Sequence, residues 1–112
     1  MNEIEKLYET AGIKFHTSKE ITYYCPFTAE KQIELLKYLG KVDWLEPIEF
    51  HFNILGYWEF YTTNVTEFAN EKHIVYQVIE NEFDIALAKL IKHLWQDLTE
   101  TEREQIRKIL KG

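Results

Sequence analysis

Two short runs of alternating apolar and polar residues, 48–53 and 57–62, constrain the fold more than any other feature of this sequence. Alternation with a period of two is typical of a strand that buries one face. A two-residue connection would set apolar residues of one run opposite polar residues of the other, whereas a three-residue loop, 54–56, keeps apolar opposite apolar. Such a loop needs a left-handed backbone at its last position, where Gly56 stands. The sequence therefore predicts a β-hairpin of defined register.

The polar residues of this hairpin share the face that we expect to turn to solvent. In the predicted register His51 lies opposite Glu59, which makes half of an acid–base pair or, in the plainer interpretation, a surface ion pair. Two tyrosines add contact area at low entropic cost. The candidate binding site is this face: Glu49, His51, Asn53, Tyr57, Glu59 and Tyr61. The alternative is that an N-terminal hairpin or a homodimer partner covers it.

Amphipathic segments on both sides of the hairpin predict helices over residues 3–11, 29–39, 83–98 and 99–110. Three of them are preceded or opened by a polar residue that suits helix capping, Asn2, Thr28 and Thr99, and the last has a complete Ser/Thr-x-x-Glu capping box. The positions expected to face the core in these helices include Ile4, Leu7, Tyr8, Ala11, Ile33, Leu36, Leu39, Leu87, Leu90, Ile91, Leu94, Leu98, Ile106, Ile109 and Leu110.

One further strand and a less regular hairpin complete the predicted sheet. Residues 73–79, HIVYQVI, are apolar on both faces, which is typical of a central or doubly covered strand. Residues 13–24 alternate around a polar stretch and predict a hairpin that would supply a fourth strand. Residues 62–72 form a polar connection with Phe68 as its expected anchor. We predict a single α+β domain over residues 1–112, an antiparallel sheet of three to four strands with helices packed on one face.

Negative charge is concentrated in the middle of the chain. The net charge is −6, but residues 43–84 hold nine acids and a single base, so the rest of the chain is slightly basic. Such a segment repels duplex nucleic acid and attracts a basic protein surface. The alternative is that the acids only keep a strand-rich region soluble.

The motifs that would indicate an enzyme or a metalloprotein are missing from the sequence. The four glycines are isolated, so no Gly-rich phosphate loop exists, and no histidine has a second ligand at a metal-binding spacing. Cys25 is the single cysteine, which agrees with a reducing compartment. The first residues lack the features of a signal peptide, and no apolar run is long enough to cross a bilayer. We predict a cytoplasmic protein that is not an enzyme, has no cofactor or metal, and binds neither nucleic acid nor membrane.

Three segments resemble small uncharacterised proteins carried by phages and prophages of Gram-positive bacteria: IEKLY at 4–8, FTAEKQIELLKYL at 27–39, and ALAKLIKHLWQDLTETEREQIRKIL at 86–110. The resemblance covers about half of the chain and consists of packing and capping residues. It implies a shared scaffold and a mobile-element origin, and it transfers no active site. The acidic hairpin lies outside it.

Together these observations favour a protein-binding module. The leading hypothesis is a phage or prophage protein whose acidic, tyrosine-bearing sheet face binds the basic surface of a host or anti-phage defence protein. An anti-CRISPR type of inhibitor is one concrete version, because nucleic-acid-guided effectors expose basic channels. The alternative is a structural or regulatory homodimer in which the same face is self-buried.

Overall fold

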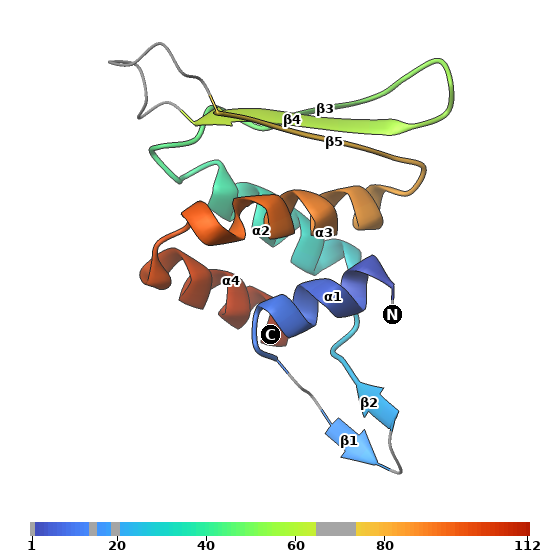
Figure 1. Ribbon diagram of the computed structural model, residues 1–112, viewed down its shortest axis with the longest axis vertical. Coiled ribbons are helices and arrows are strands. Elements are labelled where there is room, and N and C mark those ends of the chain that lie inside the picture. The colour runs from blue at the N-terminus through green and yellow to red at the C-terminus, as the bar shows by residue number, and fades with distance from the viewer. Residues whose placement is uncertain (1, 14–15, 19–20, 65–73) are drawn as a thin grey trace.

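In the residues that the structure describes, 2–13, 16–18, 21–64 and 74–112, a three-stranded antiparallel sheet has four α-helices on one side of it (Figure 1). The structure is a computed structural model. The predicted α+β class is confirmed. In chain order the elements are α1 (Glu3–Thr10), β1 (His16–Ser18), β2 (Ile21–Tyr23), α2 (Ala29–Leu39), β3 (Glu49–Phe52), β4 (Trp58–Asn64), β5 (Ile74–Glu80), α3 (Phe83–Leu94), the 3-10 turn η2 (Trp95–Asp97) and α4 (Glu100–Lys111).

The hairpin of β3 and β4 has the predicted register. The Asn53 N–H donates to the Tyr57 carbonyl oxygen at 2.8 Å, which closes a three-residue loop. Gly56, the last residue of that loop, has a φ of +87°. Apolar residues therefore lie opposite apolar residues, and the four pairs are Glu49–Tyr61, Phe50–Phe60, His51–Glu59 and Phe52–Trp58.

The position of β5 corrects the sequence prediction. The sheet order is β3-β4-β5, so β5 has a strand neighbour on one side only among the described residues. Tyr76 and Val78 are buried against the helices, but Val75 and Ile79 are 48% and 51% exposed. The prediction of a central or doubly covered strand was wrong. Apolar residues on both faces make both faces suitable for burial, but they do not determine whether another element covers them. The helices of the described fold cover one of them.

The sheet packs on α3 through β4 and β5, and the apolar stripe of α3 is fully buried. Phe60 on the inner face of β4 is also fully buried. Side chains of this size each contribute about 2 kcal/mol of gross stabilisation when removed from water. In Figure 1, α1 and α4 form a further layer on the far side of α3, and the core lies between the layers. The stripe consists of Leu87, Leu90, Ile91 and Leu94.

Helix α2 has its predicted bounds, but its buried stripe is rotated. Leu35 and Leu39 are fully buried and Leu36 is half-buried, whereas Ile33 is 53% exposed. The prediction that Ile33 faces the core was wrong. Helix α2 packs chiefly on α4, and it buries the side that carries Leu35 and Leu39, which lie four residues apart on one face of the helix.

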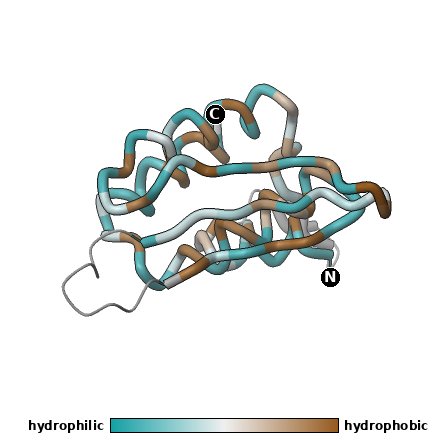
Figure 2. The backbone as a smooth tube through the Cα atoms, turned by 90° about the horizontal axis from the view of Figure 1, so that it is seen from above, coloured by the Kyte–Doolittle hydropathy of each residue, from teal (hydrophilic) through white to brown (hydrophobic). Residues whose placement is uncertain are grey.

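The inner face of β3 is covered less completely than predicted. Phe50 and Phe52 point to the helix side of the sheet, yet they are 45% and 58% exposed, because α3 lies beneath β4 and β5. The Phe50 ring packs edge-on against Phe83 with centroids 5.5 Å apart. The tip of the hairpin, Ile54 and Leu55, projects into solvent and is the hydrophobic end of the sheet in Figure 2.

The N-terminal hairpin forms, but not as part of the main sheet. β1 and β2 pair antiparallel as a separate two-stranded sheet, at the opposite end of the molecule from β3–β5 (Figure 1). The fourth strand that residues 13–24 would have supplied is therefore not added. Residues 16–18, expected to lie near the turn, form β1 itself. Phe68, the expected anchor of the following connection, lies outside the described residues.

Two hydrogen bonds tie the sheet and its connection to the C-terminal helices. The Tyr76 hydroxyl donates to Asp97 Oδ2 at 2.6 Å, and burial together with this bond raises the pKa of Tyr76 to about 12. The Trp44 indole Nε1–H donates to the Glu102 carboxylate at 3.0 Å. Glu102 also accepts the Thr99 N–H in the predicted capping box. These contacts fix the sheet over the helices.

Candidate interaction surface on the sheet

The side of the sheet that faces away from the helices, hereafter the outer face, is open as far as the described residues go. All four α-helices lie on the opposite side, and no described element crosses the outer face (Figures 1 and 2). All six residues of the predicted binding site belong to it. Alternate residues of the strands and of the β3–β4 hairpin make it up: Glu49, His51, Asn53, Tyr57, Glu59, Tyr61, Thr63, Val75, Gln77 and Ile79.

Cross-strand pairing arranges these side chains in rows. Glu59 lies between His51 on β3 and Ile79 on β5. Tyr61 lies one row further along β4 with Glu49 beside it. A row of this kind sets side chains about 5 Å apart, so neighbours are close enough to act on one ligand surface together.

Apolar side chains contribute more to the outer face than the sequence predicted. Val75 and Ile79 are about half exposed, and Tyr57 and Tyr61 are each 41% exposed. Sequence reasoning missed Val75 and Ile79 as surface residues because their strand was expected to be covered on both sides. The signal that identifies them is the pairing of β5 with the hairpin, since paired strands must share the hairpin's open face.

The Glu59 carboxylate is engaged within the outer face. His51 Nε2 lies 2.6 Å from Glu59 Oε2, and Asn53 Nδ2 donates to Glu59 Oε1 at 3.0 Å. Asn53 Oδ1 in turn accepts the N–H groups of Leu55 and Tyr57, at 2.9 and 3.1 Å. Glu59 therefore holds the asparagine that shapes the turn. The His51 side chain is 63% exposed, so its contact with Glu59 is a surface contact of small energetic weight.

The acids of the middle segment are spread over several surfaces. Only Glu49 and Glu59 are on the described outer face. Glu80 pairs with Lys89 of α3. Glu49 has no hydrogen bond or ion pair with any described residue and is the unengaged carboxylate of this surface. Asp43 and Glu46 lie in the connection before β3, and Glu82 and Asp84 lie at the start of α3.

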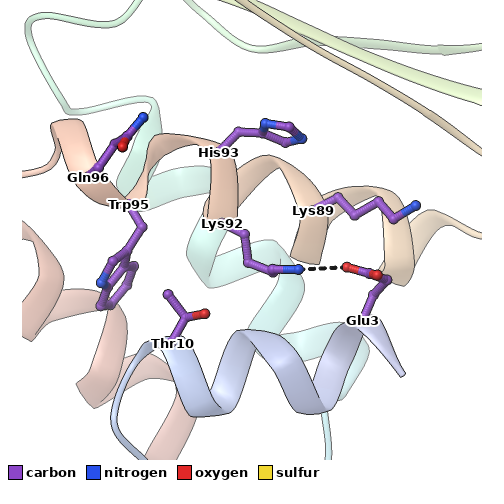
Figure 3. Close-up of a pocket in the computed structure, with 7 residues that line it drawn as sticks. All are labelled: Glu3, Thr10, Lys89, Lys92, His93, Trp95 and Gln96. Atoms are coloured by element: carbon purple, nitrogen blue, oxygen red, sulfur yellow. Dashed lines mark hydrogen bonds and ion pairs between the residues drawn. The ribbon is translucent and has the colours of Figure 1, made fainter. Parts of the chain in front are cut away.

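A pocket of about 570 Å³ lies between α1 and the C-terminal part of α3 (Figure 3). Lys92 Nζ donates to Glu3 Oε2 at 2.8 Å, and Lys89 is paired with Glu80. The hydrogen bond from Lys92 is the main reason that the pKa of Glu3 is lowered to about 2. Because carboxylates already neutralise both lysines, the pocket presents no unpaired ammonium to an anion. Its lining is Glu3, Thr10, Lys89, Lys92, His93, Trp95 and Gln96.

Side chains that bind metals do not converge in the described part of the chain, where no three or more His, Cys, Asp or Glu residues are placed to hold an ion. The Cys25 side chain is buried and 6% exposed. Among the described helices, none combines the length and apolar character needed to cross a membrane.

Comparison with known proteins adds no assignment to this geometry. No protein-family model, no curated protein and no solved structure matches the chain. The outer face is therefore interpreted from its own residues.

Proposed function

We propose that this protein is a non-enzymatic protein-binding module that uses the outer face against a basic surface of a host or anti-phage defence protein. An inhibitor of the anti-CRISPR type is the concrete version. The observation that supports the proposal is the open sheet face, on which Tyr57 and Tyr61 are each 41% exposed on a rigid strand and its turn. The resemblance to small phage-borne proteins, given above, supports the proposed origin.

The composition of the outer face favours a protein partner. Tyrosine and β-branched side chains supply contact area with little loss of rotamer entropy, and they gather here in one layer. The outer face has no Lys or Arg, and its unengaged charge is the Glu49 carboxylate. A surface of this kind complements a partner with cationic side chains around an apolar centre. The same surface disfavours nucleic acid, because binding a phosphate backbone requires cationic side chains in the binding face.

The test compares substitutions on the outer face with matched substitutions on α2. Glu49→Lys reverses the unengaged charge, and Glu34→Lys makes the same change at an exposed helix position. Ile79→Ser and Ile33→Ser remove the same side chain at 51% and 53% exposure. A tagged chain captures partners from a lysate of a Gram-positive host, and the dissociation constant of the purified partner is then measured for each variant. Glu59 is left unchanged because it holds the hairpin turn.

The proposal predicts at least a tenfold weaker affinity for Glu49→Lys and for Ile79→Ser, with both α2 variants equal to the unsubstituted chain; each tenfold change corresponds to about 1.4 kcal/mol. The affinity should also fall as salt is raised, because a charge on an exposed surface is screened. Outer-face variants that bind as tightly as the α2 variants would place the site elsewhere, and a salt-independent affinity would remove the electrostatic component.

The alternative proposal is a structural or regulatory homodimer in which two outer faces cover each other. The exposure of Val75 and Ile79 favours it, since two copies would remove these side chains from water. In that case Glu49→Lys and Ile79→Ser would change the sedimentation coefficient in the absence of any other protein. A monomer at micromolar concentration excludes this alternative.

A further inference from the structure

Strand β5 has the composition of an interior strand and the position of an edge strand. Its residues Ile74–Glu80 are β-branched, aromatic or amide-bearing except for the last. Its neighbour is β4 on one side, and the described fold places no strand on the other. The composition and the position of β5 therefore disagree, whatever the outer face binds.

The hydrogen-bond pattern shows which backbone groups of β5 have no partner among the described residues. The carbonyl oxygens of Tyr57 and Thr63 accept from the β3 side, from the N–H groups of Asn53 at 2.8 Å and Glu46 at 2.9 Å. Because backbone groups alternate in an antiparallel ladder, odd-numbered residues of β4 face β3 and even-numbered ones face β5. In the register that pairs Phe60 with Val78, the even-numbered residues of β5 are thus bonded to β4. The odd-numbered ones, Val75, Gln77 and Ile79, direct their N–H and C=O groups to the free edge.

The sequence of β5 itself has none of the features that keep an edge strand from pairing. Monomeric proteins protect such strands with Lys, Pro, bulges or short length. β5 contains seven residues, no Lys or Arg and no Pro, and its pairing with β4 runs without a bulge from Ile74 to Glu80. Its one charged residue, Glu80, is paired with Lys89. The other edge, β3, is four residues long and follows Pro47 closely.

We propose that the free edge of β5 binds β5 of a second copy of this chain, antiparallel, about a two-fold axis at Gln77. The sheets of the two copies then form one continuous six-stranded sheet. In this register the odd-numbered residues of one β5 lie opposite the odd-numbered residues of the other. Their N–H and C=O groups, which face the edge in one copy, then form about six main-chain hydrogen bonds between the two strands. The interface is isologous and therefore closes at two copies.

The side chains of β5 fit this register. On the outer face, Val75 lies opposite Ile79 of the second copy, and two half-exposed β-branched side chains cover each other on each side of the axis. The two Glu80 carboxylates lie at opposite ends of the paired strands, about 20 Å apart at the usual rise per residue. A register centred one residue away sets Gln77 opposite an apolar residue and shortens the paired segment. The register at Gln77 is therefore favoured by both faces and by length.

Sedimentation velocity from micromolar to millimolar concentration, with no other protein present, tests the pairing. A small interface of this kind gives a concentration-dependent monomer–dimer equilibrium. Gln77→Lys places two like charges face to face on the axis and should weaken dimerisation by at least tenfold. Gln96→Lys is the matched control, the same change at an exposed position after α3, and should leave the equilibrium unchanged. Circular dichroism verifies that both variants fold.

Amide hydrogen exchange of the unsubstituted chain gives a second readout that needs no variant. In the dimer, the N–H groups of Val75, Gln77 and Ile79 should exchange more slowly as concentration rises, while those of Phe50 and Phe52 at the other edge should not change. A monomer at every concentration would overturn the inference. So would a dimer that leaves the three β5 amides unprotected, or one that Gln77→Lys does not weaken, since either places the contact elsewhere. The proposed binding function is untouched by these outcomes because no partner is present.

Discussion

Replacing Gly56 by alanine tests whether the hairpin that carries the outer face depends on a left-handed residue. The φ of Gly56 is +87°, and a Cβ built there meets no atom within 4 Å. Any cost therefore comes from the backbone conformation, which disfavours an L-residue by about 1–2 kcal/mol. The smaller entropy of the unfolded alanine chain offsets part of this. We expect the free energy of unfolding to fall by about 1 kcal/mol for Gly56→Ala.

The same substitution at Gly40 is the matched control. Gly40 has a φ of −65°, and its Cβ would meet carbonyl oxygens at 3.5 Å, an ordinary contact. Gly40→Ala should therefore be neutral or raise the free energy of unfolding by about 0.5 kcal/mol. Gly56→Asn should recover much of the loss, because asparagine tolerates the left-handed region. Urea titrations followed by circular dichroism measure all three. If Gly56→Ala is as stable as Gly40→Ala, the turn does not impose this conformation and the reasoning is refuted.

Three further predictions concern the core and the helix ends. Tyr8 is fully buried and its hydroxyl has no hydrogen-bond partner in the described structure. Tyr8→Phe should therefore raise the free energy of unfolding by about 1 kcal/mol, and a loss of stability would show that the hydroxyl does have a hydrogen-bond partner. Glu102→Ala should cost about 2 kcal/mol in a urea titration, because it removes the capping box and leaves the Trp44 indole N–H unpaired; a cost within error of zero would contradict both roles. The pKa of Glu3 is lowered from 4.5 to about 2, so its pairing with Lys92 stabilises the fold above pH 4.5 and this contribution is lost as the pH falls toward 2. Lys92→Met should then lower the free energy of unfolding by about 1 kcal/mol at neutral pH. The free energy of unfolding of this variant should also fall less steeply between pH 4.5 and pH 2. An equal loss at every pH would show that Lys92 acts through packing instead.

The parts of the fold that local chemistry determines were predicted from the sequence. The β3–β4 register follows from the alternation of apolar and polar residues in the two strands and from Gly56 in the turn. The start of α4 follows from Thr99 and Glu102. In each case the residues that interact are near neighbours in the chain. The same alternation places Glu49 and Tyr61 on one face of the sheet.

The parts that depend on which elements meet were not predicted. The exposure of Ile33 is set by the packing of α2 on α4, and that of Phe50 by the lateral position of α3. Neither is encoded in the period of its own element. The same holds for Val75 and Ile79, whose apolar character suited an interior strand while strand order placed them at an edge. The hydrogen bond from Asn53 to Glu59 could be found only from the positions of the side chains. It is the reason that Glu59 is not substituted in the binding test.

Hydroxyl-radical footprinting of the chain, free and bound to its captured partner, tests most directly whether the open side of the sheet is what the partner contacts. In the free chain Tyr57 and Tyr61 should be oxidised readily. In the complex their oxidation should drop several-fold, while Tyr24, which stacks on Tyr8 of α1, and Tyr38 of α2 keep their free rates. Protection of Tyr24 or Tyr38 with Tyr57 and Tyr61 still reactive would contradict the account, because the partner would then be bound to the helical side.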